Sequence, residues 1–172
     1  MTYCVGLQID RGLVLMSDTR TNSGVDYISS FRKLHHWVVP GERVIALLSS
    51  GNLATTQAVI SKLEERSKAP GERRNSLLDA PTMFQVASLV GDVLRETIRE
   101  SAKSDSPDAS GTFTASFILA GQIAGMEPRL FLVYPEGNFI ESTADTPFFQ
   151  VGETKYGRPI LIRAYDPAMS FE

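Results

Sequence analysis

The apolar residues of this chain follow a strand-like period in two blocks, with a helix-like period between them. From Tyr3 to Leu48 apolar residues alternate with smaller or polar ones and are interrupted by turns, as in antiparallel strands. After Asn52, a plausible helix N-cap, the spacing changes to that of amphipathic helices, and from Thr112 the alternation returns. Blocks of this kind, without βαβ alternation, indicate an α+β fold of antiparallel sheets. Two stacked sheets with helices on an outer face would bury every apolar stripe.

The pattern also gives the bounds of the individual elements. Strands are predicted at 3–9, 13–16, 34–39, 44–48, 112–120, 129–134, 139–141 and 148–151. Helices are predicted after Asn52, from Pro81 to about Lys103, and at 156–163. Polar composition predicts connections at 19–30, 68–79 and 104–110.

Bulk composition excludes several classes of function. The 172 residues are 42% hydrophobic and 22% charged, which is typical of one soluble globular domain. The net charge of −3 provides no general attraction to nucleic acid or to an anionic membrane. A single cysteine, Cys4, excludes an internal disulfide and a thiolate metal cluster, and no metal or cofactor is predicted. The N-terminus lacks the features of a secretory signal, and no apolar run approaches the ~20 residues of a membrane span, so a cytoplasmic location is expected.

The N-terminal region carries the candidate chemistry. Thr2 follows Met1 directly, so removal of Met1 would place a hydroxyl nucleophile and a free α-amine base on one residue. Asp18 ends the second predicted strand and Lys33 precedes the third, and a hairpin could bring both beside Thr2. The α-amine titrates near ~7.7–8.0, and a lysine beside it would keep more of it neutral and able to act as a base. Asp18 would hold Lys33 in place.

Each of these residues has an ordinary interpretation as well. Threonine is common after an initiator methionine, and Asp18 and Lys33 could be a turn cap and a solvated flank. Gly51 lies between a predicted strand and helix, where it is either part of a loop or the donor of an oxyanion hole. Cys4 is most simply a small core residue. His35 and His36 would point to opposite faces of a strand and are poor ligands for one metal.

Several segments together resemble a known family. They are Thr2-Tyr3-Cys4-Val5-Gly6, Ser17-Asp18-Thr19-Arg20-Thr21, Phe31-Arg32-Lys33, Ser50-Gly51-Asn52 and Gly152-Glu153-Thr154-Lys155-Tyr156-Gly157. The chain is similar over nearly its whole length to the proteasome β-subunit superfamily of N-terminal-nucleophile hydrolases. The last of these segments indicates the bacterial branch called Anbu.

The resemblance implies a four-layer αββα sandwich of two antiparallel sheets that assembles into homo-oligomeric rings or open helical stacks. It also implies the roles of individual residues. Thr2 would be the nucleophile, Asp18 and Lys33 its support, Gly51 the oxyanion donor and Arg20 a brace for the acidic residue. The edge formed by Thr21 and Asn22 would pair with an extended peptide.

The sequence departs from the family pattern in two places. Glu153 stands where the family has a serine that contacts the terminal amine. Family members also continue with another helix and further strands, so residues 1–172 are expected to be a single domain of this type that lacks those elements, and Asp166–Glu172 resembles the start of such a helix.

The favoured function is an N-terminal threonine peptidase that cleaves peptide or protein substrates inside a homo-oligomer. Two alternatives stay open: a non-proteolytic amidohydrolase of the same superfamily, favoured by Glu153, and a non-catalytic scaffold subunit, which retention of Met1 would imply.

Overall fold

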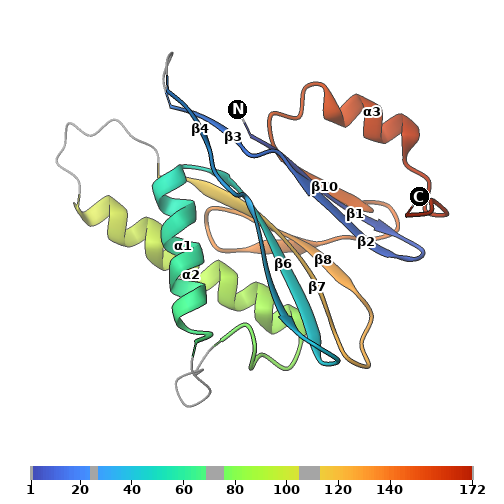
Figure 1. Ribbon diagram of the computed structural model, residues 1–172, viewed down its shortest axis with the longest axis horizontal. Coiled ribbons are helices and arrows are strands. Elements are labelled where there is room, and N and C mark those ends of the chain that lie inside the picture. Colours follow the sequence, from blue (N-terminus) through green and yellow to red (C-terminus); the bar gives the residue numbers. More distant parts are fainter. Residues whose placement is uncertain (1, 24–26, 69–75, 105–112, 172) are drawn as a thin grey trace.

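A computed structural model describes residues 2–23, 27–68, 76–104 and 113–171 of the chain. Figure 1 labels most of its strands and all three helices. The strands are β1 (Tyr3–Ile9), β2 (Gly12–Ser17), β3 (Arg20–Ser23), β4 (Tyr27–Ser30), β5 (Leu34–Val39), β6 (Arg43–Gly51), β7 (Ala115–Ile123), β8 (Arg129–Val133), β9 (Phe139–Glu141) and β10 (Phe148–Gly152). The helices are α1 (Leu53–Glu65), α2 (Met83–Ser104) and α3 (Gly157–Ala164).

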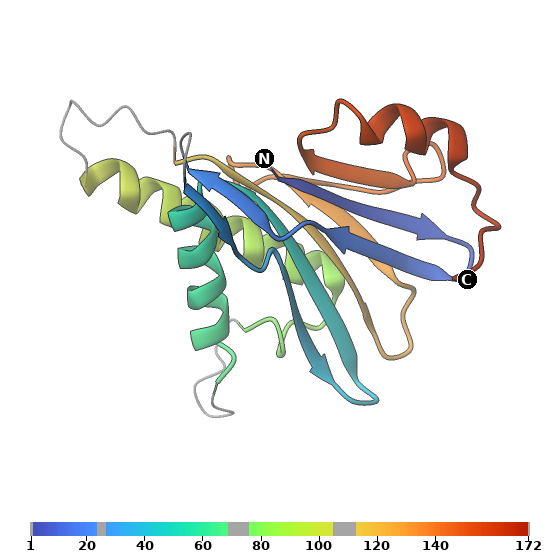
Figure 2. The same cartoon turned by 45° about the horizontal axis from the view of Figure 1, so that its top comes forward.

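The strands form two stacked antiparallel sheets and a small separate hairpin. The larger sheet has the order β5-β6-β7-β8-β9, the smaller one the order β10-β1-β2, and β3 pairs with β4. Figures 1 and 2 show α1 and α2 on the outer face of the larger sheet and α3 on the outer face of the smaller one. The order of layers is therefore helix, sheet, sheet, helix. This arrangement confirms the predicted α+β fold, a four-layer αββα sandwich.

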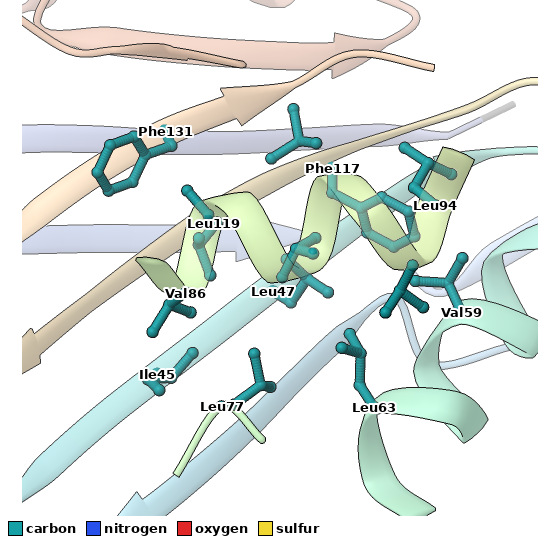
Figure 3. Close-up of a cluster of buried hydrophobic side chains, with 14 of the residues drawn as sticks. Ile45, Leu47, Val59, Leu63, Leu77, Val86, Leu94, Phe117, Leu119 and Phe131 are labelled. Atoms are coloured by element: carbon teal, nitrogen blue, oxygen red, sulfur yellow. The ribbon is translucent and has the colours of Figure 1, made fainter. Parts of the chain in front are cut away.

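Two apolar cores hold these layers together. The larger core lies between the five-stranded sheet and the pair α1 and α2, where residues such as Leu47, Phe117, Val59 and Leu94 are fully buried (Figure 3). The smaller core lies between the sheets. Its members are Cys4, Leu48, Ile118, Ala120, Leu130, Phe149 and Val151. Because alternate strand residues face opposite sides, the five-stranded sheet supplies residues to both cores.

Residues 19–30, expected to be a connection, contain the β3–β4 hairpin, so that prediction was wrong. The register pairs Arg20 with Ser30 and Asn22 with Ile28. The segment is mostly polar and lacks apolar alternation, yet main-chain hydrogen bonds form the ladder whatever the side chains. The second predicted helix also begins later than expected, at Met83, because the Thr82 hydroxyl caps it by accepting a hydrogen bond from the Gln85 N–H at 3.2 Å.

The bounds of the remaining predicted elements agree with the structure to within about three residues, and the largest shift is that of β7, predicted at 112–120 and found at Ala115–Ile123. Asn52 is the N-cap of α1, and its side chain accepts a hydrogen bond from the Thr55 N–H at 3.1 Å. Most of the predicted connections at 68–79 and 104–110 fall outside the described residues.

Residues 165–171, the described part of the segment after α3, contain no helix, although 166–172 was expected to resemble the start of one. The segment forms a turn in which the Met169 N–H donates to the Asp166 carbonyl at 3.1 Å. The Asp10 N–H donates to the Pro167 carbonyl at 2.8 Å, and the Tyr165 hydroxyl donates to the Gln8 carbonyl at 2.6 Å. These contacts fix the segment to the β1–β2 turn. Among the described residues no helix is both long enough and apolar enough to cross a membrane.

Candidate active site

Lys33 and Asp18 form a buried ion pair beside the start of β1. The Lys33 side chain is 6% exposed, and its ammonium donates to both carboxylate oxygens of Asp18, at 2.8 and 2.7 Å. The same ammonium donates to the Arg20 carbonyl at 2.5 Å. The Lys33 main chain is fixed in turn, because its carbonyl accepts a hydrogen bond from the Ser49 N–H at 2.9 Å. The predicted proximity of Asp18 and Lys33 is thus present.

The Asp18 carboxylate connects this ion pair to the N-terminal strand. Its Oδ1 accepts a hydrogen bond from the Tyr3 N–H at 2.9 Å, and its Oδ2 accepts one from the Arg20 N–H at 3.1 Å. Burial raises the pKa of Asp18, but the hydrogen bonds from Lys33, Tyr3 and Arg20 and the lysine charge outweigh it and hold the pKa below its ordinary value. Asp18 is therefore an anion that fixes the residue after Thr2.

The carbonyl of Thr2 is held from the opposite side by the turn after β10. The Glu153 N–H donates to it at 2.7 Å. Gly152 has a φ of +91°, and a Cβ there would lie 2.0 Å from the Thr2 carbonyl oxygen. Only glycine permits both this backbone conformation and this close approach. Thr2 is thus held on one side by the hydrogen bond that its carbonyl accepts, and on the other by the one that the Tyr3 N–H donates to Asp18.

Gly51 lies at the junction of β6 and α1. Its φ is +117°, and a Cβ would lie 2.5 Å from the Thr114 carbonyl oxygen, so the position requires glycine. The adjacent N-terminus of α1 favours negative charge nearby. This environment suits an oxyanion donor.

A cavity of about 380 Å³ contains Thr2, Lys33 and Gly51 in its walls. One face of α1 forms another wall. A larger cavity of about 1090 Å³ opens between the sheets near the β1–β2 turn, but Thr2, Asp18, Lys33 and Gly51 are absent from its lining. Chemistry rather than size therefore identifies the smaller cavity as the candidate site.

The other predicted site residues differ in how they contact Thr2, Asp18 and Lys33. Arg20 contacts Asp18 and Lys33 through its main chain. Glu153 contacts Thr2 through its N–H, while its carboxylate accepts a hydrogen bond from the Lys155 N–H at 3.1 Å. Thr21 and Asn22 lie on β3, paired with β4, and only their backbone is described.

Cys4 is a buried core residue, as expected. Its thiol donates to the Ser49 carbonyl at 3.5 Å. Burial, aided by the charge of Asp18 and opposed by Lys33, raises the thiol pKa to about 12. The thiolate required of a nucleophile is therefore strongly disfavoured.

His35 is a wall residue of the site that sequence reasoning missed. It lies two positions after Lys33, lines the same cavity and contacts the Arg32 carbonyl through Nε2 at 3.3 Å. Burial lowers its pKa despite the Arg32 carbonyl and the charge of Glu64. The alternation of strand residues could have indicated that His35 shares a face with Lys33. Among the described residues no group of three His, Cys, Asp or Glu side chains is arranged to hold a metal.

Comparison with known proteins agrees with this geometry. The model of the family described as "Proteasome subunit" matches residues 2–172. Anbu (ancestral beta-subunit) from Yersinia bercovieri is 44% identical, with a TM-score of 0.87, and the match covers 98% of this chain and 68% of that one. The Anbu (Gly-1) mutant from Hyphomicrobium sp. strain MC1 is 49% identical, with the same TM-score, over 99% of this chain and 68% of that one.

A third solved structure, the helical assembly of the Anbu complex from Pseudomonas aeruginosa, is 42% identical with a TM-score of 0.89. That match covers 98% of this chain and 68% of the other. None of the curated proteins compared with the chain matches it. The family match over almost the whole length and the high identity to these structures agree with each other. The chain therefore belongs to the proteasome subunit family, within its Anbu branch.

Proposed function

We propose that this chain is an N-terminal threonine peptidase that becomes active when Met1 is removed. The observation that carries the proposal is the Lys33 ammonium, buried and held by Asp18, in the wall of the cavity that also contains Thr2 and Gly51. A buried lysine paired with a carboxylate beside a hydroxyl residue is expensive to maintain for stability alone. It suits a site where a fixed positive charge is needed.

The reaction begins with proton transfer within Thr2. Its neutral α-amine takes the proton of Oγ, and Oγ attacks the carbonyl carbon of a peptide bond. The N–H of Gly51 stabilises the negative charge on the carbonyl oxygen. The protonated amine then gives its proton to the leaving amine, and water hydrolyses the ester on Thr2.

Lys33 and Asp18 tune this chemistry without reacting. A positive charge near the α-amine disfavours its protonated form, so more of it is neutral near pH 7. Asp18 holds Lys33 in position and fixes the Tyr3 N–H, which limits the orientations of Thr2. Both residues are positioning residues in this scheme.

We further propose that the active form is a homo-oligomer. The support is the Pseudomonas aeruginosa relative, whose solved structure is a helical assembly. Sedimentation velocity of the purified protein measures this directly. A chain that stays monomeric at micromolar concentration would contradict the proposal.

Intact-mass spectrometry with a peptide epoxyketone tests the catalytic proposal. The expected results are a chain that lacks Met1 and a mass increase of one inhibitor, which Thr2→Ala abolishes. A chain that always retains Met1 would instead support the scaffold alternative. A chain without Met1 that binds no inhibitor and cleaves no peptide, but hydrolyses small amides, would support the amidohydrolase alternative, which is favoured by a glutamate at position 153 where the family has a serine.

A further inference from the structure

We propose, on the basis of the peptidase function above, that Tyr3 and Gly157 together position the nucleophile Thr2. In this proposal the ring of Tyr3 packs against the first residue of α3 and fixes the start of β1, to which Thr2 is joined. Tyr3 is then a positioning residue, and Gly157 leaves the space that its ring occupies. The role is one of shape, and it reaches the reacting atoms only through the main chain.

The side chain of Tyr3 lies on the face of the smaller sheet that α3 covers. Cys4, the next residue of β1, is fully buried in the core between the sheets, and successive strand residues point to opposite faces. Tyr3 therefore points to the outer face, where Figures 1 and 2 show α3. A Cβ added at Gly157 would lie 2.1 Å from the Tyr3 hydroxyl oxygen, 2.3 Å from its Cζ and 2.6 Å from its Cε2. One edge of the ring thus occupies the place of a side chain at the start of the helix.

The backbone conformation does not require a glycine at position 157. This residue is the first of α3, and its φ is not in the left-handed region. Alanine is a far better helix former than glycine, so helix propensity alone favours a side chain here. The ring of Tyr3 is what excludes one, because three of its atoms lie closer to the added Cβ than packed atoms approach.

The main chain of Tyr3 joins the nucleophile to the ion pair of the candidate site. Its N–H donates to Asp18 Oδ1 at 2.9 Å, and its carbonyl accepts a hydrogen bond from the Asp18 N–H at 3.1 Å. Asp18 in turn holds the Lys33 ammonium at 2.7 Å. Since Thr2 is bonded directly to Tyr3, a displacement of Tyr3 would move Thr2 and strain both hydrogen bonds to Asp18.

The segment that carries Gly157 is attached at both ends to β1 or to the residue before it. Ahead of the helix the Glu153 N–H donates to the Thr2 carbonyl at 2.7 Å, and after it the Tyr165 hydroxyl donates to the Gln8 carbonyl at 2.6 Å. None of the eight residues of α3, all of which the structure describes, is buried. Core packing therefore does not explain where α3 lies, whereas its contacts with the start and the end of β1 do.

The ring of Tyr3, rather than its hydroxyl, carries the proposed role. Burial raises the pKa of this hydroxyl above its ordinary value near 10, so the group is neutral at ordinary assay pH and adds no charge beside Thr2. Phenylalanine keeps the ring, including the Cζ and Cε2 atoms nearest Gly157, and leucine removes them. The pair Tyr3→Phe and Tyr3→Leu therefore separates the ring from the hydroxyl.

The experiment follows the labelling of Thr2 by a peptide epoxyketone and determines the maximal labelling rate, kinact, separately from the inhibitor constant, KI. The variants are Tyr3→Phe, Tyr3→Leu, Gly157→Ala and the double variant Tyr3→Leu with Gly157→Ala. Intact mass establishes that the wild type and each variant lack Met1. The matched control is Ile160→Ala, a change on the exposed face of the same helix.

We expect Gly157→Ala to lower kinact about tenfold and to leave KI within twofold, because part of the ~1 Å by which the ring edge must move reaches Thr2. Tyr3→Leu should lower kinact by a similar factor, while Tyr3→Phe and Ile160→Ala should stay within twofold of the wild type. In the Tyr3→Leu background the ring atoms are absent, so Gly157→Ala should lower kinact no further. Two changes that only destabilise the fold would not show this dependence on each other.

The labelling rates also separate this proposal from the peptidase function. If the wild type is labelled and Gly157→Ala keeps the wild-type kinact, the ring has rotated away without moving Thr2, so the positioning role is overturned and the peptidase function stands. An equal loss from Gly157→Ala in the tyrosine and leucine backgrounds overturns it as well. If circular dichroism shows that Gly157→Ala does not fold, equal kinact values for Tyr3→Leu and Tyr3→Phe overturn the proposal. If the wild type lacking Met1 is not labelled, the peptidase function fails, and the role of Tyr3 with it.

Discussion

Substitution of Gly152 by alanine tests whether the turn after β10 positions Thr2. A Cβ at this position would lie 2.0 Å from the Thr2 carbonyl oxygen and 2.7 Å from its carbon. The two groups must separate by about 1 Å before they reach the shortest distances that real Cβ atoms show, near 3.0 Å. That movement strains the 2.7 Å hydrogen bond from the Glu153 N–H. The positive φ of +91° adds a second penalty for any side chain.

A matched control separates the penalty of the positive φ from the cost of the close contact with Thr2. Alanine in the left-handed region costs about 1–2 kcal/mol wherever it occurs. Gly125 also has a positive φ, +78°, but no atom lies within 4 Å of a Cβ there, so Gly125→Ala measures this penalty alone. Gly152→Ala adds the displaced carbonyl and a weakened hydrogen bond, for a total of about 2–4 kcal/mol.

The effect on activity should be larger than the effect on stability. A displacement of 1 Å at a reacting group lowers rates about 100-fold. We therefore expect Gly152→Ala to slow the labelling of Thr2 by a peptide epoxyketone about 100-fold, at a temperature where the variant is folded. Chemical denaturation and labelling kinetics measure the two effects. If Gly152→Ala unfolds with the same free energy as Gly125→Ala and labels at the wild-type rate, the positioning argument is refuted.

Three further predictions concern the ion pair and the core. Lys33→Met keeps the aliphatic stem but removes the charge, so Thr2 labelling should fall by about 100-fold or more, and an unchanged rate would remove Lys33 from the scheme. The pKa of Asp18 in the folded state lies below its unfolded value of about 3.9. The Asp18 carboxylate therefore stabilises the fold above pH ~3.9, and this stabilisation is lost as the pH falls through the folded-state pKa. The urea midpoint of the wild type should drop on acidification, and that of Asp18→Asn should drop less. Phe117→Ala should cost about 3–5 kcal/mol in urea denaturation, because the side chain is fully buried, whereas Ile160→Ala on the exposed face of α3 should cost under ~0.5 kcal/mol.

Sequence patterns predicted the parts of the fold in which burial follows a simple period. The β1–β2 hairpin, the N-cap at Asn52 and the short helix near Pro159 all carry local signals that the structure confirms. The β3–β4 hairpin carries none, because its ladder depends on main-chain pairing of mostly polar residues. The predictions therefore fail where tertiary pairing, rather than local preference, determines the structure.

The sequence likewise predicted only part of the candidate site. Asp18 and Lys33 could be placed together because one ends a predicted strand and the other precedes the next, although β2 and β5 belong to different sheets. The wall formed by α1 and His35 was not predicted, since it depends on how the helix lies against an edge strand. The need for glycine at 152 was likewise hidden, because it arises from contact with Thr2, 150 positions earlier.

The two hydrogen bonds that hold Thr2 come from segments at very different distances along the chain. Asp18 belongs to the β1–β2 hairpin, whose contacts are local in sequence, whereas Glu153 follows β10, which pairs with β1 across most of the chain. Long-range pairing closes a large loop at a higher entropic cost, so we expect it to form after the local hairpin. Until β10 pairs, the Thr2 carbonyl lacks the hydrogen bond from the Glu153 N–H, and only the Tyr3 N–H on its other side is held. A partly folded chain would then have the Asp18–Lys33 pair without an ordered threonine, so the proposed peptidase activity depends on completion of the smaller sheet.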